Sequence, residues 1–211
     1  MLIAPSVLTA DFSKLKQEIE SIDNADYIHL DIMDGNFVPN LSFGPHIAKI
    51  ISNETEVPLD THLMVLDPLK WINTFAIPGT EFITVHYESE NFLEAIRLIK
   101  EKGIKAGLSI KPATEVEEIL EYLPFVDLVL VMSVEPGFGG QKFMPEAIGK
   151  ISDLNRIRVE QGLNYLIEVD GGINDETIQQ VSAVGADIAV VGSYLFNQKN
   201  RKKEIKELKE L

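Results

Sequence analysis

The sequence predicts an α/β protein, a single-domain (β/α)8 TIM barrel that spans residues 1–211. Three observations support this prediction. Eight short apolar runs each precede an amphipathic stretch, the units repeat about every 25 residues, and no linker or change of composition divides the chain. Strands that alternate with helices form parallel sheets, and eight units in 211 residues fit a small barrel better than an open doubly wound sheet.

The first half of the chain supplies four of these units. Apolar runs predict strands at 3–8, 27–33, 58–65 and 82–87. Helical spacing of apolar residues predicts helices at 11–22, 45–51, 68–77 and 91–102. Pro45 is tolerated in the first turn of its helix, and Gly103 is a C-terminal stop signal.

The second half repeats the pattern. Strands are expected at 105–110, 127–134, 165–171 and 188–193. Helices are expected at 114–122, 145–161, 174–183 and 200–210. Gly162 marks the end of the third of these helices, and a glycine-rich loop precedes it.

Composition excludes several classes of function. The formal net charge is −14, with 33 acidic residues against 19 Lys and Arg, which argues against nucleic acid as a partner. There is no cysteine, so disulfides, thiolate metal sites and a cysteine nucleophile are excluded. No targeting signal and no apolar run long enough to cross a bilayer is present, so we expect a cytoplasmic protein that does not bind membranes.

The segment 27–39, YIHLDIMDGNFVP, places chemically active side chains on one face of a strand. Side chains alternate along a strand, so His29, Asp31 and Met33 point the same way. The turn signal Asp34-Gly35 puts them at the C-terminal end of that strand. Active sites of (β/α)8 barrels lie at this end, so polar residues at the other strand ends are candidates too.

Four of these strand-end residues make a candidate metal site. They are His29, Asp31, His62 and Asp170. Any one of them alone could be a hydrogen-bonded core histidine or a helix-capping aspartate. Together, two imidazoles and two carboxylates suit one borderline divalent ion such as Zn, Fe, Mn or Co better than Mg or Ca.

Glycines after three of the last strands predict a phosphate site. They are Gly137, Gly139, Gly140, Gly171, Gly172 and Gly192, with Phe138 and Ser193 beside them. Each glycine pair alone is an ordinary tight turn, but loops after the last two strands are the usual phosphate seat of this fold. The loop EPGFGGQKF, 135–143, could also move as a lid.

Other candidates are less specific. Met33, Met64 and Met132 fall at strand ends, where core packing and a role in walling off water explain them equally well. His86 has no acid immediately beside it and is expected to be a satisfied core histidine. Glu168 is expected to point into the barrel, where it needs a buried partner that the sequence does not identify.

Two carboxylates that face each other across a metal suggest a reaction. A metal that chelates a ketone oxygen and the neighbouring hydroxyl stabilises the enediolate while one aspartate removes a proton from carbon. The other aspartate returns a proton to the opposite face, which inverts the carbon without a redox cofactor. The same ligands could instead activate water in a metal-dependent hydrolase.

The motifs themselves resemble a known family. PSVLTAD, HLDIMDGNFVPN, FGP, DTHLMV, SVEPGFGGQKF, EVDGGI and GSYLF are similar, in order and spacing, to motifs of the ribulose-phosphate 3-epimerase family. The resemblance implies an isomerase of the pentose phosphate pathway that interconverts D-ribulose 5-phosphate and D-xylulose 5-phosphate with one divalent metal ion. It also implies a homo-oligomer, either a dimer or a hexamer.

The resemblance further implies roles for individual residues. Asp31 and Asp170 resemble the two acid/bases, and both join His29 and His62 as metal ligands. The remaining residues resemble substrate contacts, with the methionines beneath the enediolate and the glycines around the phosphate. These contacts are Ser6, Met33, His62, Met64, Met132, Gly137, Phe138, Gly139, Gly140, Gly171, Gly172, Gly192 and Ser193.

Two departures leave the substrate open. Asn36 stands where the family often has His, and Tyr87 where a small residue is common. Similar epimerases act on D-allulose 6-phosphate, so a hexulose phosphate is the first alternative. A metal-dependent hydrolase and a non-enzymatic sugar-phosphate binding protein are the others.

Overall fold

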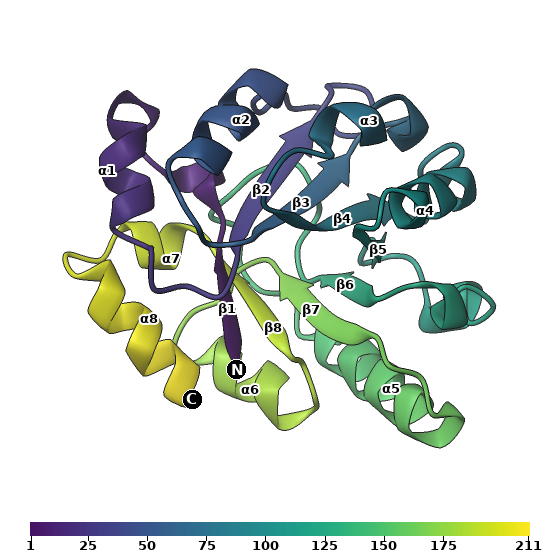
Figure 1. Cartoon of the computed structure of the whole chain (residues 1–211). Helices are drawn as coiled ribbons and strands as arrows, with labels where there is room; N and C mark the ends of the chain where they lie inside the picture. The colour runs from purple at the N-terminus through teal and green to yellow at the C-terminus, as the bar shows by residue number, and fades with distance from the viewer.

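The computed structural model describes residues 1–211 and contains one eight-stranded parallel sheet, curved into a barrel that helices surround (Figure 1). The strands are β1 (Leu2–Pro5), β2 (Ile28–Met33), β3 (Leu59–Met64), β4 (Thr80–His86), β5 (Lys105–Ile110), β6 (Leu128–Met132), β7 (Leu166–Asp170) and β8 (Ile188–Val191). Their order in the sheet is β1-β8-β7-β6-β5-β4-β3-β2. The predicted (β/α)8 barrel is confirmed.

The helices follow the strands. The α-helices are α1 (Leu15–Glu20), α2 (Pro45–Asn53), α3 (Ile72–Phe75), α4 (Phe92–Glu101), α5 (Glu146–Gln161), α6 (Thr177–Ala183), α7 (Ser193–Phe196) and α8 (Arg201–Glu210). Five 3-10 helices accompany them: η1 (Val7–Thr9), η2 (Phe12–Lys14), η3 (Pro68–Lys70), η4 (Val116–Ile119) and η5 (Leu123–Phe125). No helix is both long and apolar enough to cross a membrane.

Four helical segments differ from the sequence prediction. The helix expected at 11–22 is η2 followed by α1, and the helix expected at 68–77 is η3 followed by α3. The helix expected at 114–122 is instead the pair of 3-10 helices η4 and η5. The buried side chains of Val116, Ile119 and Leu123 produce the helical spacing, but Pro124 lacks the N–H that a continuing α-helix needs. The short helix α7, which follows β8 directly, was not predicted because the expected strand 188–193 ran through its first residue.

The main core lies between the barrel and the helices. Ile28, Leu30 and Ile32 of β2 point outward into this core, which explains why the strand is apolar at every second position. His29 and Asp31 alternate with them and point into the barrel, so the packing of β2 against its helices also fixes the direction of its polar side chains.

The seam between β1 and β2 is the weakest part of the barrel wall. The other neighbouring strands form parallel ladders, whereas β1 and β2 share only an isolated bridge between Ser6 and His29. Deeper in the seam, the amides of Asp26 and Tyr27 donate to the carbonyl of Ile3 at 3.0 and 3.4 Å. The barrel is therefore nearly closed, and its last link lies beside candidate site residues.

Candidate active site and metal centre

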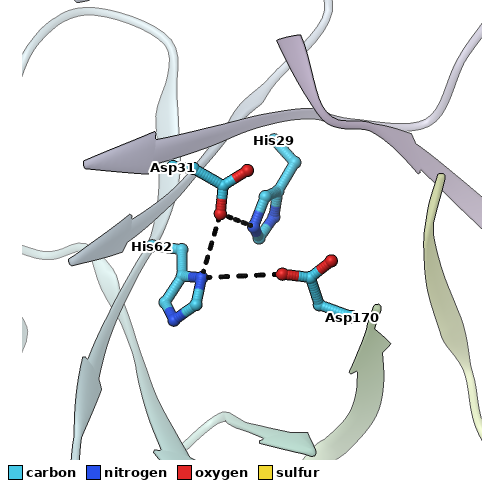
Figure 2. A group of neighbouring side chains, drawn as sticks. All are labelled: His29, Asp31, His62 and Asp170. Atoms are coloured by element: carbon cyan, nitrogen blue, oxygen red, sulfur yellow. Dashed lines mark hydrogen bonds and ion pairs between the residues drawn. The ribbon is translucent and has the colours of Figure 1, made fainter. Parts of the chain in front are cut away.

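The four predicted metal ligands converge at the C-terminal end of the barrel. One ligand atom from each of His29, Asp31, His62 and Asp170 lies within 4.8 Å of the corresponding atoms of the other three. Figure 2 shows the four side chains pointing toward one another, with Asp170 reaching across the barrel mouth from β7. The structure thus brings together the set that strand-end spacing selected.

Strand register explains this convergence. Asp31 of β2 is the direct partner of His62 on β3, and Met33 is the partner of Met64 one layer higher. His29 lies one layer deeper than Asp31 on the same face of β2. Asp170 ends β7, which is separated from β2 by β8 and β1, so it faces the other three ligands from a different part of the wall.

Asp31 is the centre of the hydrogen-bond network. Its Oδ2 accepts a hydrogen bond from the Ser6 hydroxyl at 2.6 Å. Its Oδ1 lies 3.3 Å from His62 Nδ1 and 3.4 Å from His29 Nε2. His62 Nδ1 also lies 3.9 Å from Asp170 Oδ2, so two carboxylates approach the same imidazole nitrogen.

His29 supplies the clearest evidence that this set fits a cation. Its Nδ1 lies 2.5 Å from Asp60 Oδ2, an acceptor that places the ring proton on Nδ1. Its Nε2 is fully buried, has no hydrogen-bond partner, and faces Asp31. An unpartnered imidazole nitrogen beside carboxylate oxygens is the donor set of a borderline divalent ion.

The surroundings shift the pKa values of Asp31 and Asp170 in opposite directions. Burial raises the pKa of Asp31, but His29 and His62 outweigh it, and the pKa lies below its usual value. Burial and the charge of Asp31 raise the pKa of Asp170 to about 7. A cation between them would oppose the second shift, because it favours both ionised carboxylates.

A cavity opens above the four residues, and most of the predicted substrate contacts line it. The predicted residues on its wall are Ser6, Asp31, Met33, Met64, Met132, Gly137, Phe138, Gly139, Gly140, Asp170, Gly171, Gly172, Gly192 and Ser193. His62 is the exception, since its side chain is fully buried below the cavity and does not line it. Thr9 and Gln141 also line the wall and were not singled out from the sequence.

Two glycines after β7 allow the backbone to approach the cavity. Gly171 and Gly172 have φ angles of +125° and +65°, which residues with a side chain rarely adopt. A Cβ on Gly172 would lie 2.3 Å from the backbone nitrogen of Phe143, so this turn packs directly on the loop after β6. The glycines therefore bring two loops together at the wall of the cavity.

The loop 133–145 is anchored at its sides and exposed at its tip. The side-chain amide of Gln141 donates to the carbonyls of Glu135 and Phe138 at 2.6 and 2.9 Å. Asn40 donates to the carbonyl of Gly137 at 2.7 Å. The side chain of Phe138 nevertheless remains 56% exposed over the cavity edge.

His86 differs from its sequence interpretation. It is fully buried, as expected of a core histidine, but an acid does lie beside it: Glu88 Oε2 is 3.1 Å from His86 Nδ1. His86 Nε2 lies 2.8 Å from Nε2 of His62. The sequence interpretation missed this contact because Glu88 lies beyond the end of β4, where strand periodicity no longer applies.

Glu168 points into the barrel, as predicted, but has no hydrogen-bond partner. Both carboxyl oxygens are buried and unpaired, and the nearest cationic atom, His29 Nδ1, is 3.9 Å from Oε1. Burial first, and the neighbouring Asp60 second, raise the pKa of Glu168 well above its usual value. The environment of Glu168 therefore favours its protonated form.

Sequence comparison identifies similar proteins over nearly the whole chain. The model of the ribulose-phosphate 3 epimerase family matches residues 2–196. A ribulose-phosphate 3-epimerase of Bacillus subtilis is 45% identical over 98% of this chain and 97% of its own length. One from Helicobacter pylori J99 is 43% identical over 99% of this chain and 96% of its own length.

Solved structures share the fold at low sequence identity. A 3-hexulose-6-phosphate synthase from Salmonella typhimurium has a TM-score of 0.73 at 17% identity, covering 100% of this chain and 97% of that one. KGPDC from Streptococcus mutans has a TM-score of 0.75 at 10% identity, covering 99% and 95%. At these identities the likeness concerns the barrel alone.

Proposed function

This chain belongs to the ribulose-phosphate 3-epimerase family, and from that premise we propose that it inverts C3 of D-ribulose 5-phosphate to give D-xylulose 5-phosphate, and the reverse, with Asp31 and Asp170 as its two acid/bases. The enzyme is an epimerase, of the isomerase class. The relatives are ribulose-phosphate 3-epimerases, so a hexulose phosphate, a hydrolytic reaction or simple binding is not favoured.

The observation that supports the roles of the acids is their placement. Asp31 and Asp170 both line the cavity, and they reach it from strands that lie three places apart around the barrel. A sugar carbon between them has one carboxyl group on each face. Removal of a proton by one and delivery by the other inverts the carbon, whereas two acids on one flank would return the same epimer.

The hydrogen bonds prepare Asp31 for this task. The Ser6 hydroxyl holds Oδ2, so the carboxylate cannot rotate freely about its bond to Cβ. The lowered pKa of Asp31 keeps it ionised and able to accept a proton, and without a metal ion the raised pKa of Asp170 allows that group to carry one. Two carboxyl groups with separated proton affinities are a common acid/base arrangement.

One divalent ion is part of the proposal, held by His29, Asp31, His62 and Asp170. When bound, it supplies positive charge that stabilises the negative charge left on the substrate oxygens when a proton leaves carbon. The mixed nitrogen and oxygen donors favour Zn, Fe, Mn or Co. The methionines Met33, Met64 and Met132 wall this region with apolar atoms that limit entry of water.

The phosphate is proposed to lie against the glycine turns after β6, β7 and β8. Gly171, Gly172 and Gly192 line the same cavity as the two acids, and Ser193 begins the short helix α7 beside them. Backbone N–H groups at such turns bind anions without a bulky side chain in the way. Family resemblance extends the proposal to a cytoplasmic homo-oligomer, either a dimer or a hexamer.

Deuterium exchange tests the assignment of the two acids. In deuterated water the wild-type enzyme is expected to incorporate deuterium at C3 of both epimers. Asp170→Asn and Asp31→Asn should each lower epimerisation by about 10²–10⁴-fold, the usual contribution of one general acid or base. Each variant should retain exchange in one epimer only, and the two variants should differ in which epimer exchanges.

The control is Asp175→Asn, which removes an exposed carboxylate just after the β7 turn. It should epimerise at the wild-type rate. Bound metal must be measured in every variant, since both candidate acids are also candidate ligands. Epimerisation at the control rate by a metal-loaded Asp170→Asn enzyme would reject the two-base assignment.

A further inference from the structure

A series of hydrogen bonds leads from His62 to the rim of the barrel. His62 Nε2 lies 2.8 Å from His86 Nε2, and His86 Nδ1 lies 3.1 Å from Glu88 Oε2. Both imidazoles are fully buried, and the Glu88 side chain is 20% exposed. The other oxygen of Glu88, Oε1, accepts hydrogen bonds from the backbone N–H of Lys111 at 2.8 Å and the hydroxyl of Thr114 at 2.5 Å.

The direction of these hydrogen bonds is set at Glu88. Burial raises its pKa, but His86, Thr114 and the Lys111 amide outweigh that effect and lower it to about 2. An ionised carboxylate only accepts hydrogen bonds. The proton between Glu88 Oε2 and His86 Nδ1 must therefore be carried by His86 Nδ1.

The proton on His86 Nδ1 also determines which ring nitrogen of His62 carries a hydrogen. His86 is fully buried, which disfavours the charged ring. A neutral imidazole carries one proton, so a hydrogen on His86 Nδ1 leaves His86 Nε2 as an acceptor. The two Nε2 atoms are 2.8 Å apart, too close for both to carry a hydrogen, so His62 Nε2 donates. His62 Nδ1 is then left with a lone pair directed at Asp31 Oδ1 and Asp170 Oδ2.

A lone pair beside two carboxylate oxygens is repelled unless a cation lies between them. The deduced tautomer of His62 therefore agrees with the unpartnered Nε2 of His29, which faces the same Asp31 oxygen. Metal-binding histidines commonly donate their other ring N–H to an outer acceptor that fixes the tautomer. In this protein that acceptor is a second imidazole, itself held by a carboxylate.

We propose that His86 and Glu88 are positioning residues that fix the tautomer of His62 and direct its Nδ1 lone pair at the metal. The role in metal binding rests on the proposed function, whereas the order of the hydrogen bonds does not. Neither residue lines the cavity, so they act through His62 rather than on substrate.

Glu88→Gln is the informative variant because it should reverse the direction of every hydrogen bond between residue 88 and His62. The backbone N–H of Lys111 cannot accept a hydrogen bond, so the amide oxygen of the new side chain must stay on that side. The NH2 group then faces His86 Nδ1 and donates to it. His86 would donate from Nε2 to His62, and His62 would carry its proton on Nδ1, where it blocks metal coordination.

The matched control is Glu90→Gln, which removes the same charge from an exposed position two residues along the same loop. Zinc affinity is to be measured by chelator competition on the full-length protein. We expect Glu88→Gln to weaken zinc binding by about 10–100-fold, the usual effect of losing an outer partner of a ligating histidine. Glu90→Gln should bind zinc as the wild type does.

Nitrogen-15 NMR of the ring nitrogens gives a second readout that needs neither substrate nor a stable variant. In the zinc-loaded wild-type protein, His86 should be protonated on Nδ1 and His62 on Nε2. Protonation of wild-type His86 on Nε2 alone, or equal zinc affinity in Glu88→Gln and Glu90→Gln, would overturn the proposal. If the wild type shows the expected tautomers and Glu88→Gln the expected loss of zinc affinity, but the wild type does not epimerise the sugar phosphate, the proposed function fails while this inference stands.

Discussion

The two candidate metal-binding imidazoles lie on neighbouring strands but are supported by different parts of the barrel. His29 rests on Asp60 in the barrel interior, with Glu168 close by. His62 rests on His86, and through it on Glu88 at the rim. Both rings are fully buried, so the difference lies in what stands behind them.

The support behind His29 is poor in hydrogen bonds. Asp60 Oδ1 and both oxygens of Glu168 are buried without partners, whereas every ring nitrogen and carboxylate oxygen from His86 to Glu88 has one. His29 is therefore oriented mainly by the charge of Asp60 in the buried interior of the barrel. His62 is oriented by a series of hydrogen bonds that runs through His86 to Glu88 at the barrel rim.

The pKa shifts follow the same division. Burial lowers the pKa of His29, but the carboxylates of Asp60 and Asp31 outweigh it and raise the pKa well above the usual value. Burial dominates at the other two rings, so the pKa of His62 is lowered and that of His86 falls to about 4. Of the three rings, only His29 is thus held by strong attraction to neighbouring carboxylates.

The largest effect should come from removing the charge behind His29. Asp60→Ala leaves His29 Nδ1 without its acceptor, so zinc affinity should fall by about 10–100-fold. The unpaired buried N–H should also lower the free energy of unfolding by about 1–3 kcal/mol. Chelator competition and urea unfolding measure the two effects.

Asp60→Asn is the matched control, since its side-chain oxygen can still accept from Nδ1 without carrying a charge. If charge is what orients His29, Asn should restore only part of the zinc affinity. Full recovery with Asn would show that a hydrogen-bond acceptor suffices, and the contrast between the two rings would disappear.

The next effect is expected in the pH dependence of stability without metal. Below about pH 6.5 an unfolded chain protonates His86, but the folded protein does so only near its pKa of about 4. The unfolded state thus binds more protons in this window, and the free energy of unfolding falls as the pH falls. One such group contributes up to about 1.4 kcal/mol per pH unit.

Urea unfolding of the wild type and His86→Gln in the presence of a chelator, between pH 6.5 and 4.5, checks this expectation. The variant should show the shallower slope. His29 has the opposite sign, because a raised pKa contributes stability at low pH that is lost as the pH rises through the folded value. Equal slopes in the two proteins would show that His86 is not neutral in the fold.

The smallest effect is expected from Glu168→Gln. The raised pKa of Glu168 favours its protonated form, and glutamine has nearly the same shape as that form and is also uncharged. The free energy of unfolding should therefore change by less than about 1 kcal/mol, within the range of a typical single hydrogen bond. A loss of several kcal/mol would show that Glu168 is ionised and belongs to the charge that holds His29.

The sequence predicted the barrel and the four converging ligands because both depend on local periodicity. Alternation along β2 and β3 separates outward Leu30 and Leu63 from inward Asp31 and His62, and strand ends are recognisable from turn residues. The prediction of an α-helix at 114–122 was wrong because side-chain spacing alone does not distinguish an α-helix from two 3-10 helices.

The supports behind the ligands could not be predicted in the same way. Asp60 lies on the same face of β3 as His62, but its contact with His29 depends on the register between β2 and β3. Glu88 lies beyond its strand, and its partners Lys111 and Thr114 come from the next unit of the fold. Such contacts arise only when separate strands are placed side by side.

The seam between β1 and β2 couples the thermal stability of the barrel to its catalytic activity. The upper part of this joint consists of the bridge between Ser6 and His29 and the hydrogen bond from Ser6 to Asp31. A change that separates β1 from β2 therefore also displaces Asp31, a candidate base, and His29, a candidate metal ligand. On gradual heating, therefore, turnover should cease while the seven paired ladders still give the spectrum of a folded barrel.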